Sequence, residues 1–368
     1  MVIDMNKKDR IGIADVSSFS NLFYDLAHLF TIFTGAVSSG VLLYSKINSI
    51  KTNYRIRKDF SPRDGYIISL SDEVNKNIEV FNYAEISKFK HSDQILHFID
   101  TIRKNFNEDD LAFMVNNFNN LKVYNFKLED YLRSDGIRAY YSSLDNAIFL
   151  HEGNPKEYIF HELFHASSTI GKDDKFCVGF ANYSENPIGY GINEGYTQFL
   201  TNRYFPSKLS KFFYPYLTQI AEIVEYIVGK DEMQSMYMRC ELNSLYEKLS
   251  SYSSPEDAMN FLFTLDNICS NLYKKGINKE SEEILNQALY EINVYLIRFS
   301  INKTIKDMNG NNLSLNNIYS KCLPVVHSLP AKLDSVHFKC NFWDSRIALS
   351  TLCDEFSNAL NLNAYKKK

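Results

Sequence analysis

The sequence predicts an α+β fold in which a mixed half with a small sheet is followed by a mainly helical half. Two short runs of hydrophobic residues, 137–142 and 147–151, are typical of strands joined by a turn. Beyond Pro206, hydrophobic residues recur at the spacing of amphipathic helices. We therefore expect three regions: an N-terminal segment (1–60), an α/β region (61–205) and a helical C-terminal region (206–368).

The composition is that of a globular protein. The chain has 368 residues, of which 45% are hydrophobic and 23% charged, so it is long enough to bury a substantial core. Its net charge of −4 provides no basic surface for nucleic acid, and we expect no nucleic-acid partner. The six cysteines form no C-x-x-C pair, which excludes a thiolate zinc knuckle and favours reduced, buried thiols.

The N-terminal region contains one apolar segment, residues 26–44, without Asp, Glu, Lys or Arg. Its length of about 19 residues just suffices to span a bilayer. The helical spacing of its hydrophobic residues equally suits a buried helix, so both interpretations stay open. The basic residues that follow would keep the rest of the chain in the cytoplasm. We expect a cytoplasmic protein, with membrane association through residues 26–44 left open.

Two helices are predicted in the middle of the chain. The first runs from Asn154, a good N-cap with Pro155 in the first turn, to Gly171. The second runs from Asn193 to Tyr204, after two glycines (Gly189 and Gly191) interrupt the chain and before Pro206 stops it.

The C-terminal region is predicted to consist of amphipathic helices. One hydrophobic stripe covers 217–228 and ends at Gly229, and another covers 284–299. The segment from Ser254 to Asp257 favours a helix start with Ser254 as the cap.

The motif H-E-x-x-H lies in the first of the two middle helices. His161 and His165 are four residues apart, so both imidazoles project from one face and can reach a single Zn²⁺. Glu162 can lie beside the metal without binding it, where a general base is needed. The alternative is a helix with two core or surface histidines and an exposed glutamate.

A third ligand candidate lies in the sequence Asn193-Glu194-Gly195. A catalytic zinc needs three protein ligands and one open position, and the carboxylate of Glu194 can complete the set. We expect it in the first turn of the second helix, where an acidic residue also interacts favourably with the helix dipole. On its own, Glu194 is therefore better explained as a structural residue.

Together the two motifs resemble those of the gluzincin metallopeptidases, and the Asn-Glu-Gly form is similar to that of the zinc aminopeptidases in this clan. The resemblance covers about 60 residues and implies a zincin-like catalytic core, with one zinc ion held by His161, His165 and Glu194. It implies that Glu162 is the catalytic acid/base and that the chain hydrolyses peptide bonds of peptides or proteins. It also suggests that residues 147–151 form an edge strand that pairs with substrate, although a core hairpin fits the pattern equally well.

The sequence departs from the family pattern at two points. The gap of 28 residues between His165 and Glu194 is longer than in the aminopeptidases, and Gln198 stands where the thermolysin-like pattern has an Asp. The group that orients the ligand histidine is therefore left open. A donor for the developing oxyanion also stays unassigned among five candidates: Tyr183, Tyr190, Tyr196, His327 and His337.

Two other functions remain as alternatives to the peptidase. One is a non-catalytic protein that uses zinc for folding or partner binding, which is disfavoured because structural zinc sites usually have four protein ligands. The other is a membrane-attached regulatory or scaffold protein, suggested by residues 26–44.

Overall fold

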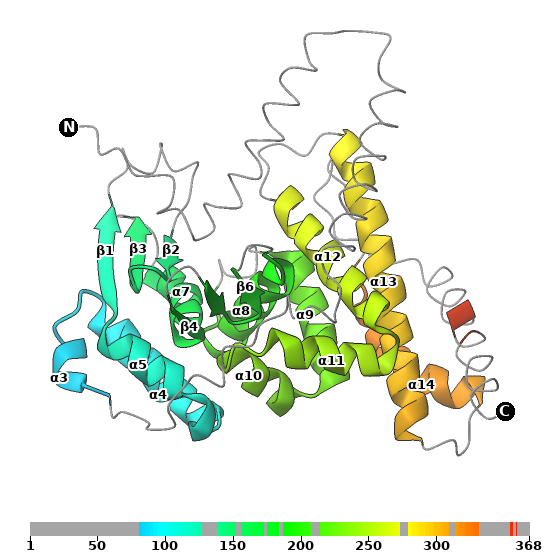
Figure 1. The fold of residues 1–368 in the computed structure, drawn as a ribbon, viewed down its shortest axis with the longest axis horizontal. Coiled ribbons are helices and arrows are strands. Elements are labelled where there is room, and N and C mark those ends of the chain that lie inside the picture. Colours follow the sequence, from blue (N-terminus) through cyan, green and yellow to red (C-terminus); the bar gives the residue numbers. More distant parts are fainter. Residues whose placement is uncertain are drawn as a thin grey trace, which may run out of the picture. The chain divides into compact units, whose positions relative to one another are not determined.

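The chain divides into two compact units, residues 1–68 and 69–368. The computed structural model describes part of the second unit: residues 81–126, 139–151, 156–172, 175–183, 187–207, 214–272, 279–308, 314–330, 354, 355 and 358. Within these residues the fold is mixed α+β and mainly helical, as predicted (Figure 1). The predicted division into 1–60, 61–205 and 206–368 stays a prediction.

The first sheet has three strands in the order β1-β3-β2. β3 is parallel to β1 and antiparallel to β2, with Tyr141 opposite Ile148. The predicted hairpin is confirmed, since β2 and β3 are joined by the turn at 143–146. The elements of this part are α3 (Tyr83–Ile86), α4 (Ser92–Asn105), η3 (Glu108–Asp110), α5 (Ala112–Asn119), β1 (Lys122–Phe126), β2 (Ala139–Ser142) and β3 (Ala147–His151).

The suggestion that residues 147–151 form an edge strand is wrong. β3 pairs with a neighbour on each side, so its backbone groups are used within the sheet. No clear strand pattern marks β1, the partner that makes β3 the central strand. Among the described strands of this sheet, β2 is the edge that lies against helix α7 (Ile159–Ser167).

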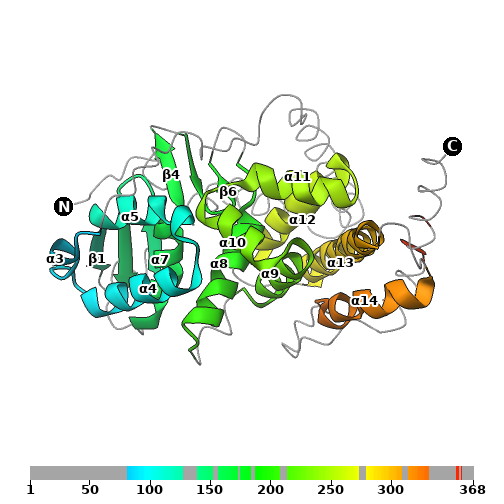
Figure 2. The same cartoon turned by 90° about the horizontal axis from the view of Figure 1, so that it is seen from below.

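Helix α7 is preceded by η4 (Lys156–Tyr158) and is buried along its whole length. Helices α4 and α5 both pack against it (Figure 2). Its aromatic side chains contact those of neighbouring elements, as in the edge-to-face pair of Phe98 and Phe164, whose ring centroids are 4.9 Å apart. Because α7 is buried, the histidine motif lies inside the protein.

The first middle helix ends earlier than predicted, at Ser167 instead of Gly171. The side-chain amide of Asn117 donates to the carbonyls of Ala166 and Thr169, at 2.9 and 2.8 Å, and so satisfies groups that a longer helix would use. Gly171 lies in strand β4 of a second sheet that the sequence did not predict. This antiparallel sheet has the order β4-β5-β6, with strands β4 (Thr169–Lys172), β5 (Lys175–Val178) and β6 (Ala181–Asn182).

The second middle helix, α8 (Tyr190–Tyr204), begins three residues before the predicted start and ends where predicted. Gly191 is therefore a helical residue and does not interrupt the chain. Glu194 consequently lies in the second turn of the helix and not in the first. Helix α8 packs against α7 and against two helices of the C-terminal part, α9 (Pro215–Val228) and α12 (Pro255–Leu272).

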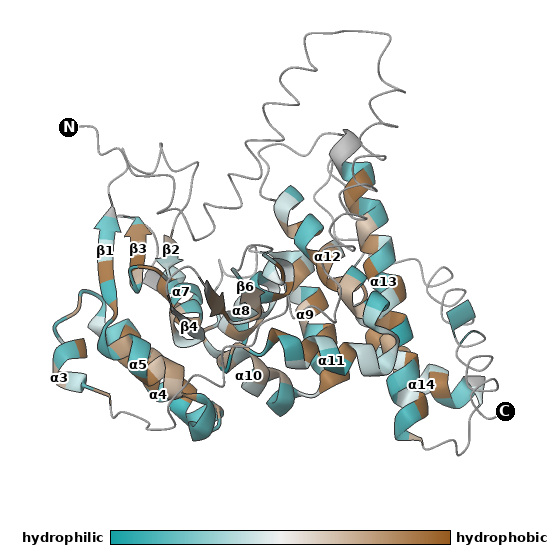
Figure 3. Ribbon diagram, in the orientation of Figure 1, coloured by the Kyte–Doolittle hydropathy of each residue, from teal (hydrophilic) through white to brown (hydrophobic). Residues whose placement is uncertain are grey.

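The C-terminal part consists of helices, in agreement with the sequence. The hydrophobic stripe of α9 is buried and the helix ends before Gly229, while Ser254 accepts a hydrogen bond from the Asp257 N–H at the start of α12. Hydrophilic and hydrophobic residues alternate along α11, as expected of an amphipathic helix (Figure 3). The remaining helices are α10 (Lys230–Met238), α11 (Leu242–Tyr252), α13 (Lys279–Asp307) and α14 (Leu315–Ser328).

Two glycines allow α8 to lie unusually close to its neighbours. A Cβ atom on Gly195 would lie 2.3 Å from the carbonyl oxygen of Leu217 in α9, and one on Gly191 would lie 2.4 Å from that of Leu265 in α12. The helix backbones are therefore in direct contact at both points. All residues from 191 to 201 are buried, so α8 forms the centre of this part of the fold.

Two other predictions concern membranes and thiols. Within the described ranges, no helix has both the length and the hydropathy needed to cross a membrane, and residues 26–44 lie outside these ranges. Cys177, Cys240, Cys269 and Cys322 are buried, reduced thiols, as predicted, whereas Cys340 and Cys353 lie outside the described residues.

Candidate metal centre

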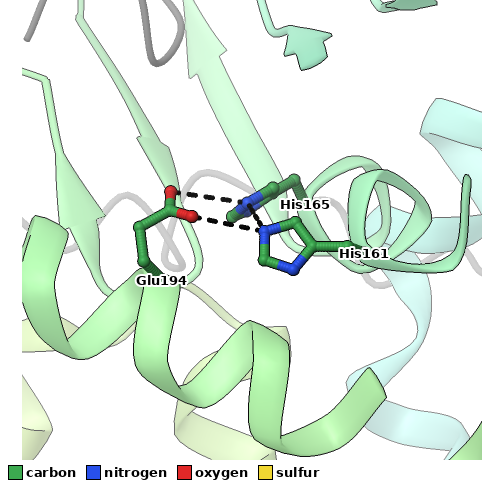
Figure 4. Close-up of side chains that lie close together, drawn as sticks. All are labelled: His161, His165 and Glu194. Atoms are coloured by element: carbon green, nitrogen blue, oxygen red, sulfur yellow. Dashed lines mark hydrogen bonds and ion pairs between the residues drawn. The ribbon is translucent and has the colours of Figure 1, made fainter. Parts of the chain in front are cut away.

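Three side chains from two helices converge at the contact between α7 and α8. His161 and His165 come from α7 and Glu194 from α8, and the glutamate carboxylate extends toward both imidazoles (Figure 4). The Nε2 atoms of the two histidines are 3.1 Å apart. The carboxylate oxygens of Glu194 lie 3.2 Å from Nε2 of His161 and 3.5 Å from Nε2 of His165. All three side chains are buried, and together they can hold a metal ion.

The spacing of these atoms fits a tetrahedral metal ion. With metal–ligand bonds of roughly 2.0–2.2 Å, two ligands of a tetrahedral zinc lie roughly 3.3–3.6 Å apart. The three separations, 3.1–3.5 Å, are close to this range. Two imidazoles and one carboxylate are also the donor set of one class of catalytic zinc site. Both the geometry and the chemistry of this cluster therefore suit zinc.

Gln198 orients the first histidine. Its amide nitrogen donates to Oδ1 of Asn202 at 2.9 Å, and its Oε1 therefore faces Nδ1 of His161 at 3.0 Å. Because an amide oxygen only accepts hydrogen bonds, Nδ1 of a neutral His161 carries the proton and Nε2 presents its lone pair to the cluster. Gln198 thus occupies the orienting position that the sequence left unassigned, and it does so with a neutral amide in place of a carboxylate.

Asn193 lies next to the second histidine. Its Oδ1 accepts a hydrogen bond from the Phe180 N–H at 3.0 Å, and its Nδ2 lies 3.5 Å from Nδ1 of His165. The loop between β5 and β6 therefore fixes the Asn193 side chain, which in turn lies against the His165 ring. The Asn-Glu-Gly sequence supplies a neighbour of His165, a candidate ligand and a close helix contact in three successive residues.

Glu162 is buried beside the cluster in the way that a general base requires. Its carboxylate accepts a hydrogen bond from the backbone N–H of Tyr141 in β2, while its Oε2 has no hydrogen-bond partner among the described residues. Burial raises the pKa of Glu162 to about 7, although the charge of His161 opposes this shift. A buried carboxylate with one unpaired oxygen is suited to accept a proton near neutral pH.

Glu194 has the opposite electrostatic behaviour. Burial acts against its ionisation, but His165 and His161 outweigh burial and lower the pKa of Glu194 to about 2. The pKa values of the neighbouring carboxylates Glu162 and Glu194 are thus shifted in opposite directions. This separation matches a division between a proton acceptor and a permanently charged ligand.

The contacts of the described residues single out none of the five candidate oxyanion donors. The hydroxyl of Tyr196 is buried and donates to Glu225 at 2.6 Å, so it connects α8 with α9. Tyr183 and Tyr190 pack edge-to-face against each other. His327 lies in the last turn of α14, and His337 lies outside the described residues.

Tyr214, which precedes α9, is a neighbour of the cluster that was not predicted. Its ring is stacked on the imidazole of His161, with 5.8 Å between ring centroids. Its backbone is left-handed, with φ of 49°, which is uncommon for a bulky residue. No local pattern marks this position, because a contact between residues 53 positions apart depends on the packing of α8 against α9.

Comparison with known proteins gives no match: no protein-family model, no curated protein and no solved structure resembles this chain. The resemblance to gluzincins therefore rests on the two sequence motifs and on the geometry of the cluster.

Proposed function

We propose that this chain is a zinc-dependent metallopeptidase of the gluzincin type, in which His161, His165 and Glu194 bind one zinc ion. The observation that carries the proposal is the convergence of these three side chains beside a buried Glu162 with an unpaired oxygen. A zincin-like arrangement of the catalytic core is part of the same proposal. The separations of 3.1–3.5 Å and the orientation of His161 by Gln198 support it.

In this proposal each polar group has one task. A bound zinc supplies Lewis acidity and lowers the pKa of a water molecule toward 7. Glu162 accepts a proton from the attacking water on its carboxylate and passes it to the nitrogen of the leaving amine. Gln198 holds His161 with Nε2 toward the cluster, and Glu194 provides the anionic ligand, whose charged form a bound cation would stabilise.

The edge of strand β2 is the proposed binding place for an extended peptide. The backbone N–H of Tyr141 is directed to Glu162, and among the described strands β2 is paired on one side only, so this edge lies next to the proposed base. A peptide added to this edge would form backbone hydrogen bonds and bring a scissile bond toward Glu162. The substrate class is therefore a peptide or an unfolded protein segment, with no nucleic-acid partner expected.

The substitution Glu162→Gln tests the catalytic role. The purified full chain, loaded with zinc, is incubated with a peptide library and the products are identified by mass spectrometry. Glu162→Gln should keep one zinc per chain and lose cleavage by at least 100-fold, because the amide cannot accept the proton (about 10²–10⁴-fold for general base catalysis). Glu157→Gln, which changes an exposed glutamate in η4, should retain activity.

Other outcomes separate the alternatives. Unchanged turnover in Glu162→Gln would reject Glu162 as the base. One zinc per wild-type chain without cleavage of any peptide would point to a non-catalytic zinc protein. No zinc together with retention in a membrane fraction would favour the scaffold alternative based on residues 26–44.

A further inference from the structure

The N-terminus of α8 is capped from another helix. The residue before the helix, Gly189, has no side chain that could accept a hydrogen bond, and the first N–H groups of a helix lack partners within it. Asp266 of α12 supplies them. Its Oδ2 accepts the N–H of Gly189 at 2.9 Å, and its Oδ1 accepts the N–H of Gly191 at 2.8 Å.

This cap differs from an ordinary N-cap because it joins distant parts of the chain. Asp266 is 75 residues from Gly191 and belongs to the helical C-terminal region. The backbones of α8 and α12 are in contact here, since a Cβ on Gly191 would lie 2.4 Å from the carbonyl oxygen of Leu265. Two hydrogen bonds accepted by one half-buried carboxylate therefore fix both the position of α8 along its axis and its rotation.

Helix α8 transmits this placement to Glu194, which lies three residues after Gly191. Each residue of an α-helix advances by about 1.5 Å and turns by about 100°, so even a partial slip or rotation of α8 would misplace the carboxylate. We propose that Asp266 is a positioning residue for the metal ligand Glu194 and acts through the N-terminus of α8. The inference rests on the proposed function, because it concerns the same metal centre.

The proposal implies that the helical region helps to determine the geometry of the metal site. Asp266 accepts hydrogen bonds from backbone N–H groups at the start of α8, so its effect on the centre passes through the backbone of that helix. Substitution of Asp266 should therefore weaken zinc binding more than an equally destabilising substitution elsewhere in the helical region.

The experiment measures zinc affinity in the full chain by competition with a chromophoric chelator. The variants are Asp266→Asn, which keeps one acceptor oxygen, and Asp266→Ala, which keeps none. Ile318→Ala is the control, because Ile318 is buried in α14, which packs against α13 and α9. Thermal unfolding of each variant reports stability, and the absorption spectrum of the cobalt-substituted protein reports the geometry at the metal.

We expect the dissociation constant for zinc to rise about 10- to 100-fold in Asp266→Ala and by less in Asp266→Asn. The cobalt spectrum should change in both. Ile318→Ala should lower the melting temperature and leave the zinc affinity and the cobalt spectrum as in wild type. If Asp266→Ala does not fold, the comparison of Asp266→Asn with Ile318→Ala decides.

Two results would overturn the proposal. One is wild-type zinc affinity in the folded Asp266 variants, and the other is equal weakening by Ile318→Ala. In either case a wild-type chain that binds zinc and cleaves peptides leaves the proposed function intact. A wild-type chain that binds zinc without cleaving peptides would reject the peptidase proposal and leave the proposed role of Asp266 intact. A wild-type chain that takes up no zinc would reject both proposals.

Discussion

Replacing Gly195 with alanine should disrupt the proposed metal site by separating two helices. The added Cβ would lie 2.3 Å from the carbonyl oxygen of Leu217 and 2.6 Å from its carbon, whereas an ordinary contact is at least 3.4 Å. Helix α8 would have to move away from α9 by about 1 Å, since a backbone carbonyl cannot rotate aside as a side chain can. Zinc–ligand distances tolerate only about 0.2 Å, so this displacement is several times too large for Glu194.

The sign of the stability change makes this prediction sharp. In an unobstructed helix, Gly→Ala stabilises by about 1 kcal/mol. Overpacking at this contact should instead destabilise the protein by about 1–3 kcal/mol. Urea unfolding of the metal-free protein measures this change in the free energy of unfolding. Chelator competition measures the zinc affinity, which we expect to fall at least tenfold.

The control again is Ile318→Ala, which should destabilise the protein through a cavity in α14, a helix that packs against α13 and α9, and leave the zinc affinity unchanged. A Gly195→Ala protein that is more stable than wild type and binds zinc equally well would refute the argument from close helix contact.

Three further predictions concern the same centre. Gln198→Leu should weaken zinc binding by about 10- to 100-fold because His161 loses its orienting acceptor, whereas Gln198→Glu should not; equal affinities of the two variants in chelator competition would contradict this. Free zinc at 100 times its dissociation constant should stabilise the wild-type chain by about 2.7 kcal/mol in urea unfolding, and Glu194→Ala should show no such gain at that concentration. In metal-free protein, the pKa of Glu162 of about 7 exceeds its unfolded value of 4.5, so its contribution to stability falls as pH rises from 4.5 to 7, by roughly 3 kcal/mol. Glu162→Gln should remove that loss, and parallel stability curves for the two proteins between pH 4.5 and 8 would argue against it.

The parts of the site that were predictable depend on local spacing. His161 and His165 share a helix face because they are four residues apart, and this holds in any α-helix. The strands around the turn at 143–146 and the helix that ends before Gly229 also follow from short patterns. The convergence of Glu194 on the histidines was expected from a resemblance between motifs, and the structure places it there.

The features that were not predictable depend on partners distant in the sequence. Helix α8 starts at Tyr190 because Asp266 caps it from α12, and no rule about neighbouring residues contains that information. The central position of β3 requires its parallel partner β1, whose sequence has no clear strand pattern. The early end of α7 depends on Asn117, which lies about 50 residues before the helix terminus.

The burial of α8 on all sides has a consequence for how the protein is made. Synthesis produces α7 and α8 before α9 and α12, the two helices against which α8 packs. The carboxylate of Glu194 is thus expected to reach its place only after residue 272 has left the ribosome and α9 and α12 have packed against α8. If the proposed function holds, a growing chain would carry no assembled hydrolytic centre until that point and could not cleave its own unfolded segments.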